Sequence, residues 1–213
     1  MLLKLPSGFR IIVPPFFFWE LRSEYGLKIH SRQAFHPEHT TTRLCLELLD
    51  LDLKSAPCRS LLDVGCGTGI LGLAAAALGV PFVAGLDIDE RAVRLSRENA
   101  ARNGAHETTR WFVGTADALR ARFDYVVANL RYSVLLEILD SLMALLDEGG
   151  RLIVSGFHDI HWHSIRETLV QGGLQVQDFL SADRSFFGIP PSGSFTWIAC
   201  RAIKGCTGAG DGS

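Results

Sequence analysis

Three glycines and an aspartate in the first half of the chain have the types and spacing of a nucleotide-binding turn. Gly65, Gly67 and Gly69 follow the short, mostly apolar segment Leu61–Val64, and Asp87 ends the next apolar run. Glycine lets the main chain bend sharply and lets a ligand approach closely, because it has no Cβ atom. The amide groups that begin the following helix face the same crevice. An acid at the tip of the neighbouring strand can accept hydrogen bonds from two ribose hydroxyls. These residues predict a site for a nucleoside-containing cofactor.

The spacing of the glycines distinguishes between cofactors. A dinucleotide site has the pattern G-x-G-x-x-G, which needs a glycine at position 70, where this chain has Ile70. A phosphate-binding P-loop needs a lysine after the turn, and this turn has none. Asp63 instead precedes the first glycine by two residues, which gives D-x-G-x-G-x-G. That pattern is typical of the S-adenosylmethionine site of Rossmann-like methyltransferases. The alternative is an ordinary glycine-rich turn of a parallel sheet, in which the glycines and both acids coincide by chance.

Other polar residues follow the ends of predicted strands. Asn129 closes a strand on the side where ligands bind in open parallel sheets. Asp117 lies where such methyltransferases contact adenine, and a plain surface acid is the alternative. Asp63 is expected to anchor the turn by accepting from main-chain amides or from the amino group of the cofactor, and a purely structural cap is the alternative. Asp89 is expected to cap the next helix.

The histidines are weighed as metal ligands and as pocket residues. His158, His161 and His163 lie close together, but on a helix His163 does not share the face of the other two. No cysteine or clustered acid completes a ligand set, so we predict no metal site. His36 and His39 are expected to shape the pocket rather than to carry protons.

Strands and helices alternate from Ser60 onward. The predicted strands are 60–65, 82–87, 110–113, 123–128 and 150–156, and the predicted helices are 69–79, 89–103, 133–147 and 159–171, with a short helix near 115–121. Such alternation indicates parallel strands joined by right-handed crossovers, hence an α/β, doubly wound, Rossmann-like sheet of about seven strands. Leu174–Ser181 and Ser194–Ala202 have no helix between them and should form an antiparallel pair at one edge. An apolar helix, Arg43–Leu53, precedes the sheet, with the threonines before it as the predicted N-cap.

Composition indicates a protein of the cytoplasm with one domain. The chain has 213 residues, 47% of them hydrophobic, and a formal net charge of −2, which argues against a large footprint for nucleic acid. Its five scattered cysteines form no C-x-x-C pair, which suits reduced thiols. Pro6 interrupts the N-terminus before a secretory segment could form, and no apolar run approaches the roughly 20 residues of a membrane span.

The expected domain organisation has three parts. Residues 1–35 form an extension packed on the domain, and this extension includes a strand over Phe9–Val13. Its aromatic cluster Phe16–Trp19 is expected to pack on the core; a wall of the substrate pocket and a contact with a partner are the alternatives. Residues 36–204 form the S-adenosylmethionine-dependent methyltransferase domain. The glycine-rich tail 205–213 is expected to be disordered.

Six segments in a fixed order make the resemblance to a known family specific. They are His39–Glu47, the glycine turn, Leu86–Asp89, Glu98–Gly104, Val127–Leu130 and Gly149–Gly156. Together they resemble the catalytic domain of the ribosomal protein L11 methyltransferase family, over about residues 33–202. The resemblance implies that Thr42, Gly65, Asp87 and Asn129 hold the cofactor or face the transferred methyl group. The predicted cofactor-binding set is therefore Thr42, Asp63, Gly65, Gly67, Gly69, Asp87, Asp117 and Asn129, with Asn129 also catalytic.

The chain departs from the family in ways that concern the acceptor. Phe35–Glu38 replaces a glycine-containing loop, and only about thirty residues stand where the family has a separate substrate domain, too few for an independent fold. Leu130–Tyr132 replaces the Pro-Pro-Tyr of related amide and amine methyltransferases, and Tyr132 is expected to line the pocket. The leading hypothesis is N-methylation of a protein, on lysine or an α-amine, with a ribosomal protein as the substrate that the resemblance suggests. A small-molecule or RNA methyltransferase, or a non-catalytic S-adenosylmethionine-binding protein, are the alternatives.

Overall fold

The computed structural model describes residues 2–13, 26–31, 39–183 and 196–205. The aromatic cluster Phe16–Trp19 and the loop Phe35–Glu38 lie outside the described residues, as does the predicted tail beyond Gly205.

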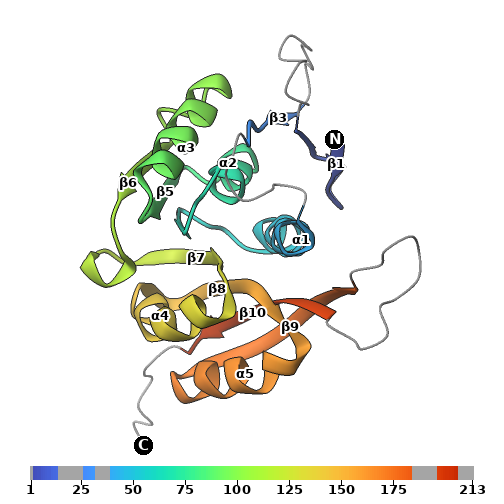
Figure 1. Cartoon of the computed structure of the whole chain (residues 1–213), viewed down its shortest axis with the longest axis vertical. Helices are drawn as coiled ribbons and strands as arrows, with labels where there is room; N and C mark the ends of the chain where they lie inside the picture. Colours follow the sequence, from blue (N-terminus) through green and yellow to red (C-terminus); the bar gives the residue numbers. More distant parts are fainter. Residues whose placement is uncertain (1, 14–25, 32–38, 184–195, 206–213) are drawn as a thin grey trace, which may run out of the picture.

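A seven-stranded sheet forms the centre of the molecule (Figure 1). Its strands are β4 (Ser60–Val64), β5 (Phe82–Asp87), β6 (Thr109–Val113), β7 (Phe123–Asn129), β8 (Leu146–His158), β9 (Leu174–Asp183) and β10 (Thr196–Lys204). Their order is β6-β5-β4-β7-β8-β10-β9; the first five are parallel, and β10 runs antiparallel to both neighbours. The predicted doubly wound sheet with an antiparallel edge is confirmed. Strand order reverses between β4 and β7, which is where such sheets bind ligands.

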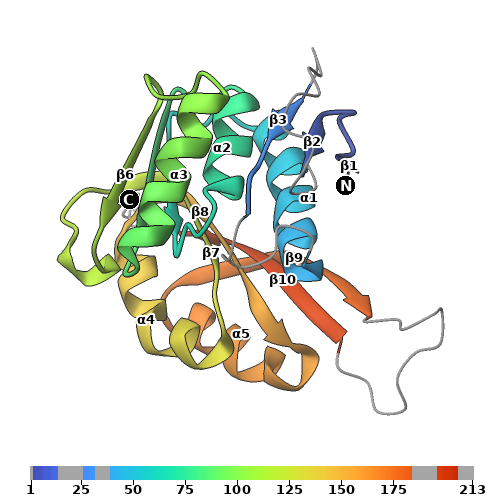
Figure 2. The ribbon, with the colours of Figure 1, turned by 45° about the horizontal axis from the view of Figure 1, so that its top comes forward.

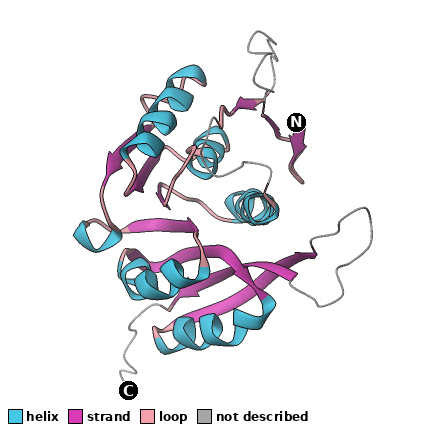
Figure 3. Ribbon diagram, viewed as in Figure 1, coloured by secondary structure: helices cyan, strands magenta, loops and turns pink. Residues whose placement is uncertain are grey.

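Helices cover both faces of the sheet (Figures 1 and 3). They are α1 (Thr40–Ser55), α2 (Ile70–Ala77), α3 (Glu90–Arg102), α4 (Tyr132–Ala144) and α5 (Trp162–Gln171), with 3-10 turns at Ala116–Ala118 and Asp159–His161. Figure 1 shows α1 and α2 above the central strands and α4 and α5 below them. Leu61 packs in the hydrophobic cluster that includes residues of α1 and α2, and Leu62 packs in a second hydrophobic cluster, because successive side chains of a strand point to opposite faces of the sheet. No described helix is both long enough and apolar enough to span a membrane.

Helix α1 begins earlier than predicted, and a different residue caps it. The His39 Nδ1 atom accepts the N–H of Thr41 at 3.3 Å. Thr40 is already helical, and the side chains of Thr41 and Thr42 are buried in the first turn. The prediction that the threonines form the N-cap is therefore wrong.

Two further boundaries differ because an apolar pair joins the sheet. Leu145 and Leu146 are buried, and Leu146 pairs with Phe123. Helix α4 therefore ends at Ala144 rather than at 147, and β8 begins at Leu146 rather than at 150.

A small second sheet packs beside α1 and α2 (Figure 2). It consists of β1 (Leu2–Lys4), β2 (Arg10–Ile12) and β3 (Leu27–Lys28) in that order. Strand β2 falls within the predicted strand Phe9–Val13. Ile11 and Ile29 are fully buried in the same cluster as α1 and α2.

Candidate cofactor and acceptor site

The glycine turn between β4 and α2 has a backbone conformation that favours glycine. The φ angles of Gly65, Gly67 and Gly69 are +70°, +56° and +76°. A Cβ atom at Gly65 would lie 2.3 Å from a methyl carbon of Leu130, so this part of the turn is covered. At Gly67 the nearest described atom is the Gly65 carbonyl oxygen, 3.9 Å away. The turn therefore leaves its main chain open to a ligand at Gly67.

Asp87 ties the turn to the end of β5. Its Oδ2 accepts the N–H of Gly67 at 3.0 Å, and its Oδ1 accepts the N–H of Asp89 at 3.0 Å. A carboxylate has about four lone-pair positions, so Asp87 can still accept from hydroxyls of a ligand. Asp89 accepts the N–H of Arg91 at 2.9 Å and caps α3, as predicted.

Two exposed apolar side chains flank Asp87, and sequence reasoning missed both. Ile88 is 79% exposed and Val113 is 51% exposed, although both are large and apolar. Val113 ends β6 directly opposite Asp87 in the sheet register. The sequence did contain a signal for this surface: Ile88 is apolar and directly follows Asp87, at a loop position that is usually polar. Such side chains offer a surface on which a flat heterocycle can lie.

Asp63 lies beneath the turn, away from solvent. It is 1% exposed, and its Oδ2 accepts the N–H of Gly72 at 2.9 Å. Burial raises the pKa of Asp63 to about 7; the Gly72 N–H opposes this rise and the charge of Asp87 adds to it. The carboxyl group thus anchors the first turn of α2, and its contact with a cofactor stays a prediction.

Thr42 and Asn129 meet, although they are far apart in the sequence. The Asn129 Nδ2 atom, at the end of β7, donates to the Thr42 Oγ1 atom in the first turn of α1 at 3.2 Å. The Asn129 Oδ1 atom is buried and has no hydrogen-bond partner among the described residues. A buried amide oxygen without a partner costs free energy. Asn129 is therefore an acceptor poised for a donor that the described part of the chain does not supply.

Leu130 is fixed between two glycines. Its side chain lies over Gly65, and its main chain crosses Gly156 so closely that a Cβ atom there would be 1.9 Å from the Leu130 oxygen. Gly156 has φ +98°. The segment that follows Asn129 thus passes tightly between the glycine turn and β8, which fixes where Asn129 points.

Asp117 and Tyr132 lie near the carboxyl ends of the strands. Asp117 is in the 3-10 turn after β6, and a hydrogen bond from the Thr115 side chain lowers the pKa of the exposed Asp117 carboxyl. Tyr132 stacks on His161 with ring centroids 3.7 Å apart. Its hydroxyl group lies 3.4 Å from the Ser164 Oγ atom. Contact of Asp117 with adenine, and of Tyr132 with a substrate, stay predictions.

The three clustered histidines have three separate neighbours. His158 packs on Trp197 with centroids 3.7 Å apart, His161 stacks on Tyr132, and His163 pairs with Glu167 at 3.1 Å. Among the described residues, no group of three or more histidines, cysteines or acids is arranged to hold a metal ion.

The sheet order, its antiparallel edge and the glycine turn at the switch point define a Rossmann-like methyltransferase fold. More narrowly, the chain belongs to the ribosomal protein L11 methyltransferase family, whose sequence model matches residues 26–184. The ribosomal protein L11 methyltransferase of Neisseria meningitidis serogroup B is 45% identical over 139 residues, 64% of this chain and 45% of the relative. The chain thus spans less than half the length of this relative.

Solved structures agree on the fold. The ribosomal protein L11 methylase from Lactobacillus delbrueckii subsp. bulgaricus superposes with a TM-score of 0.73 at 26% identity, covering 95% of each chain. The magnesium protoporphyrin IX methyltransferase from Synechocystis PCC 6803, solved with bound SAM, superposes with a TM-score of 0.60 at 21% identity, covering 75% of this chain and 76% of that one. At this identity the second likeness shows the fold alone.

Proposed function

We propose that the protein is an S-adenosylmethionine-dependent methyltransferase that methylates an amine nitrogen of a protein. The observation that carries the proposal is the buried Asn129 Oδ1 atom, which has no partner among the described residues and lies at the ligand-binding end of β7. An amine that approaches this end of the sheet would supply the missing donor.

The residues present fit the cofactor. The open main chain at Gly67 and the acceptor positions of Asp87 suit a ribose and the chain attached to it, and Ile88 and Val113 suit an adenine ring. Asp117 would hold the exocyclic amino group of the adenine. The solved Synechocystis methyltransferase with this fold has SAM bound.

Methyl transfer requires alignment of the reacting atoms more than stabilisation of a developing charge. When bound, the cofactor supplies a methyl group on a sulfonium sulfur, which leaves as a neutral thioether when a nitrogen lone pair attacks the methyl carbon. A lysine amine has a pKa of about 10.4 in water and must lose a proton before it can attack. Burial beside a positive charge lowers the pKa of the amine. Asn129 Oδ1 would then accept a remaining N–H and orient the lone pair, while Thr42 holds the Asn129 amide in place.

The proposed acceptor is a lysine or α-amino nitrogen of a ribosomal protein. The Neisseria and Lactobacillus relatives are both named for ribosomal protein L11. We place the reaction in the cytoplasm, because Cys45, Cys58, Cys66 and Cys200 are free thiols.

The decisive test is a labelled-methyl assay on wild type and Asn129→Ala, with separate ribosomal protein, RNA and metabolite fractions as acceptors. We expect transfer to protein, reduced on the order of a hundredfold in the variant because the nitrogen is no longer aligned. Calorimetry with S-adenosylhomocysteine should show a much smaller loss of cofactor affinity in the variant. Transfer to RNA or metabolites alone would overturn the protein acceptor. Tight binding without transfer would identify a non-catalytic binding protein.

A further inference from the structure

Two polar side chains of α3 and that of its C-cap residue, Asn103, turn toward the rest of the protein. Ser96 and Asn99 are fully buried and Asn103 is partly buried. The inward face of a helix is usually apolar, because a buried polar group without a partner costs free energy. Here most partners of these side chains are main-chain groups of two segments distant in sequence.

The first of these segments is the glycine turn. The Ser96 Oγ atom donates to the carbonyl oxygen of Gly67 at 3.1 Å, and the Asn99 Nδ2 atom donates to the carbonyl oxygen of Thr68 at 2.9 Å. Asp87 holds the N–H of Gly67 from the other side. Helix α3 thus fixes the carbonyl groups of the turn, which determines where the remaining main chain of the turn faces.

The second segment is β3 and the residues after it, which lie beside α2 (Figure 2). The Asn103 side chain accepts the N–H of Lys28 at 2.8 Å and donates to the Lys28 oxygen at 2.7 Å. The Asn99 side chain does the same with His30, at 3.1 Å and 3.0 Å. Strand β2 pairs with the other edge of β3. The two amides therefore complete the edge of β3 as a neighbouring strand would.

Asn99 is the one of the three side chains that contacts both segments. Its two amide hydrogens are divided between the oxygens of Thr68 and His30, and its oxygen accepts from His30. A flipped amide would put its oxygen against two carbonyl oxygens, so the network fixes the orientation of the group. The bonds to the two segments thus depend on one another.

We propose that Asn99 is a positioning residue that couples the docking of residues 27–30 to the shape of the glycine turn, and thereby sets the affinity for the cofactor. The inference rests on the proposed function, which makes the turn a cofactor site. Coupling is reciprocal, so cofactor binding must also tighten the docking of β3.

A crossed set of variants separates the contacts. Ser96→Ala removes a bond to the turn. Asn103→Ala removes the bonds to β3 and one bond within the end of α3, to the Asn99 main-chain oxygen at 2.8 Å, but none to the turn. Asn99→Ala removes bonds to both segments. The amide of Ile29 reports on β3, because its acceptor is the Ile12 oxygen, which none of the variants removes. The amide of Gly67 reports on the turn.

We expect Asn99→Ala to weaken binding of S-adenosylhomocysteine by about fivefold or more, the lower end of ordinary coupling between sites, and Asn103→Ala to change it by less than about twofold. In wild type the bound ligand should slow hydrogen exchange at Ile29, and this response should vanish in Asn99→Ala. A residue that only stabilises the fold would leave the response intact.

Hydrogen exchange in the ligand-free protein tests the coupling even if the wild type binds no cofactor. Such a failure to bind would refute the proposed function alone. Asn99→Ala should then speed exchange at both Gly67 and Ile29, whereas Ser96→Ala should act mainly at Gly67 and Asn103→Ala mainly at Ile29. An effect of Asn99→Ala on one segment alone, or equal losses of affinity in Asn99→Ala and Asn103→Ala, overturns the inference. If Asn99→Ala does not fold, Asn99→Asp takes its place with the same expectations: it keeps the acceptor for the His30 N–H and loses the donors to the oxygens of Thr68 and His30.

Discussion

At the scale of single residues, Asp87 combines a structural and a binding role. Its carboxylate holds the N–H groups of Gly67 and Asp89, and it is the predicted partner of the ribose. Asp87→Ala should therefore weaken binding of S-adenosylhomocysteine by about 1.5–3 kcal/mol, the range for hydrogen bonds to charged groups. Asp89→Ala is the matched control, because it removes a carboxylate that caps α3. It should cost about 1 kcal/mol of stability and leave cofactor affinity unchanged. Calorimetric titration checks both, and equal affinity in Asp87→Ala and wild type would place the ribose elsewhere.

The buried Asp63 carboxyl group makes stability depend on pH. Burial raises its pKa from 3.8 to about 7, so folding favours the protonated form. The stability that this group contributes is complete below its unfolded pKa and is lost as pH rises through about 7. Asp63→Asn keeps an acceptor for Gly72 and removes the titration. Urea unfolding gives the free energy of unfolding of both proteins at pH 5 and at pH 8. From pH 5 to pH 8, the difference in this free energy should shift in favour of Asp63→Asn over wild type by more than about 1 kcal/mol, since one pKa unit is worth about 1.4 kcal/mol. A constant offset between the two proteins at all pH values would contradict this prediction.

At the scale of elements, the tight crossing of Leu130 over β8 requires Gly156. An alanine there has to adopt φ +98° and would place Cβ 1.9 Å from the Leu130 oxygen. Gly79 has a similar φ, +103°, but no described atom lies within 4 Å of the point where its Cβ would stand, so Gly79→Ala measures the backbone strain alone. That strain should cost roughly 1–2 kcal/mol. Urea unfolding should show Gly156→Ala less stable than this control by more than about 2 kcal/mol, because the clash forces the main chain apart. Equal losses would mean that Leu130 moves aside freely.

The elements that the sequence predicts well are those whose signals are local. The strands β4 and β5 and the glycine turn follow from short apolar runs and glycine spacing, and their predicted bounds differ from the structure by at most a residue or two. The cap of α1 was misassigned because three threonines, all good caps, follow His39. Only the structure shows that Thr40 is already helical and that Thr41 and Thr42 are buried. Asn99 was recognised only as part of a motif, because its partners His30 and Thr68 are separated from it by 69 and 31 residues. The family resemblance likewise assigned Thr42 and Asn129 to one predicted site, but nothing in the sequence predicted the hydrogen bond between them.

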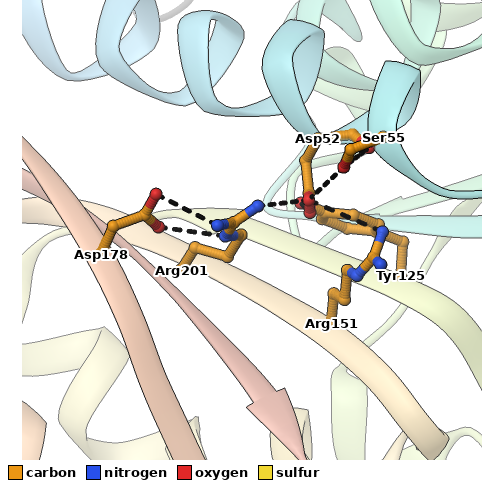
Figure 4. A network of polar contacts seen from close by, with 6 residues as sticks. All are labelled: Asp52, Ser55, Tyr125, Arg151, Asp178 and Arg201. Atoms are coloured by element: carbon orange, nitrogen blue, oxygen red, sulfur yellow. Dashed lines mark hydrogen bonds and ion pairs between the residues drawn. The ribbon is translucent and has the colours of Figure 1, made fainter.

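At the scale of the whole molecule, one buried carboxylate joins α1 to the sheet (Figure 4). Asp52, near the end of α1, accepts from the Tyr125 hydroxyl at 2.5 Å and from the Arg201 guanidinium, and it lies 3.6 Å from Arg151. These partners come from β7, β10 and β8. Helix α1 is about 24 Å long at 1.5 Å per residue, and its other end carries Thr42. The network thus fixes one end of the helix and the candidate site lies at the other.

The two acids that bind Arg201 differ in burial, so removing each of them should lower the free energy of unfolding by a different amount. Asp52 is 1% exposed, whereas Asp178, which holds the same guanidinium through two bonds of 3.0 Å and 3.1 Å, has a side chain that is 51% exposed. Asp52→Ala leaves the tyrosine hydroxyl and the arginines without their buried partner, and it should cost about 3–5 kcal/mol. Asp178→Ala breaks an ion pair that water can replace, and it should cost less than about 1 kcal/mol. Urea unfolding of both variants, with an unchanged denaturant slope as the criterion of two-state behaviour, measures the difference. Losses of similar size would show that the buried carboxylate of Asp52 contributes no more to stability than the exposed ion pair between β9 and β10.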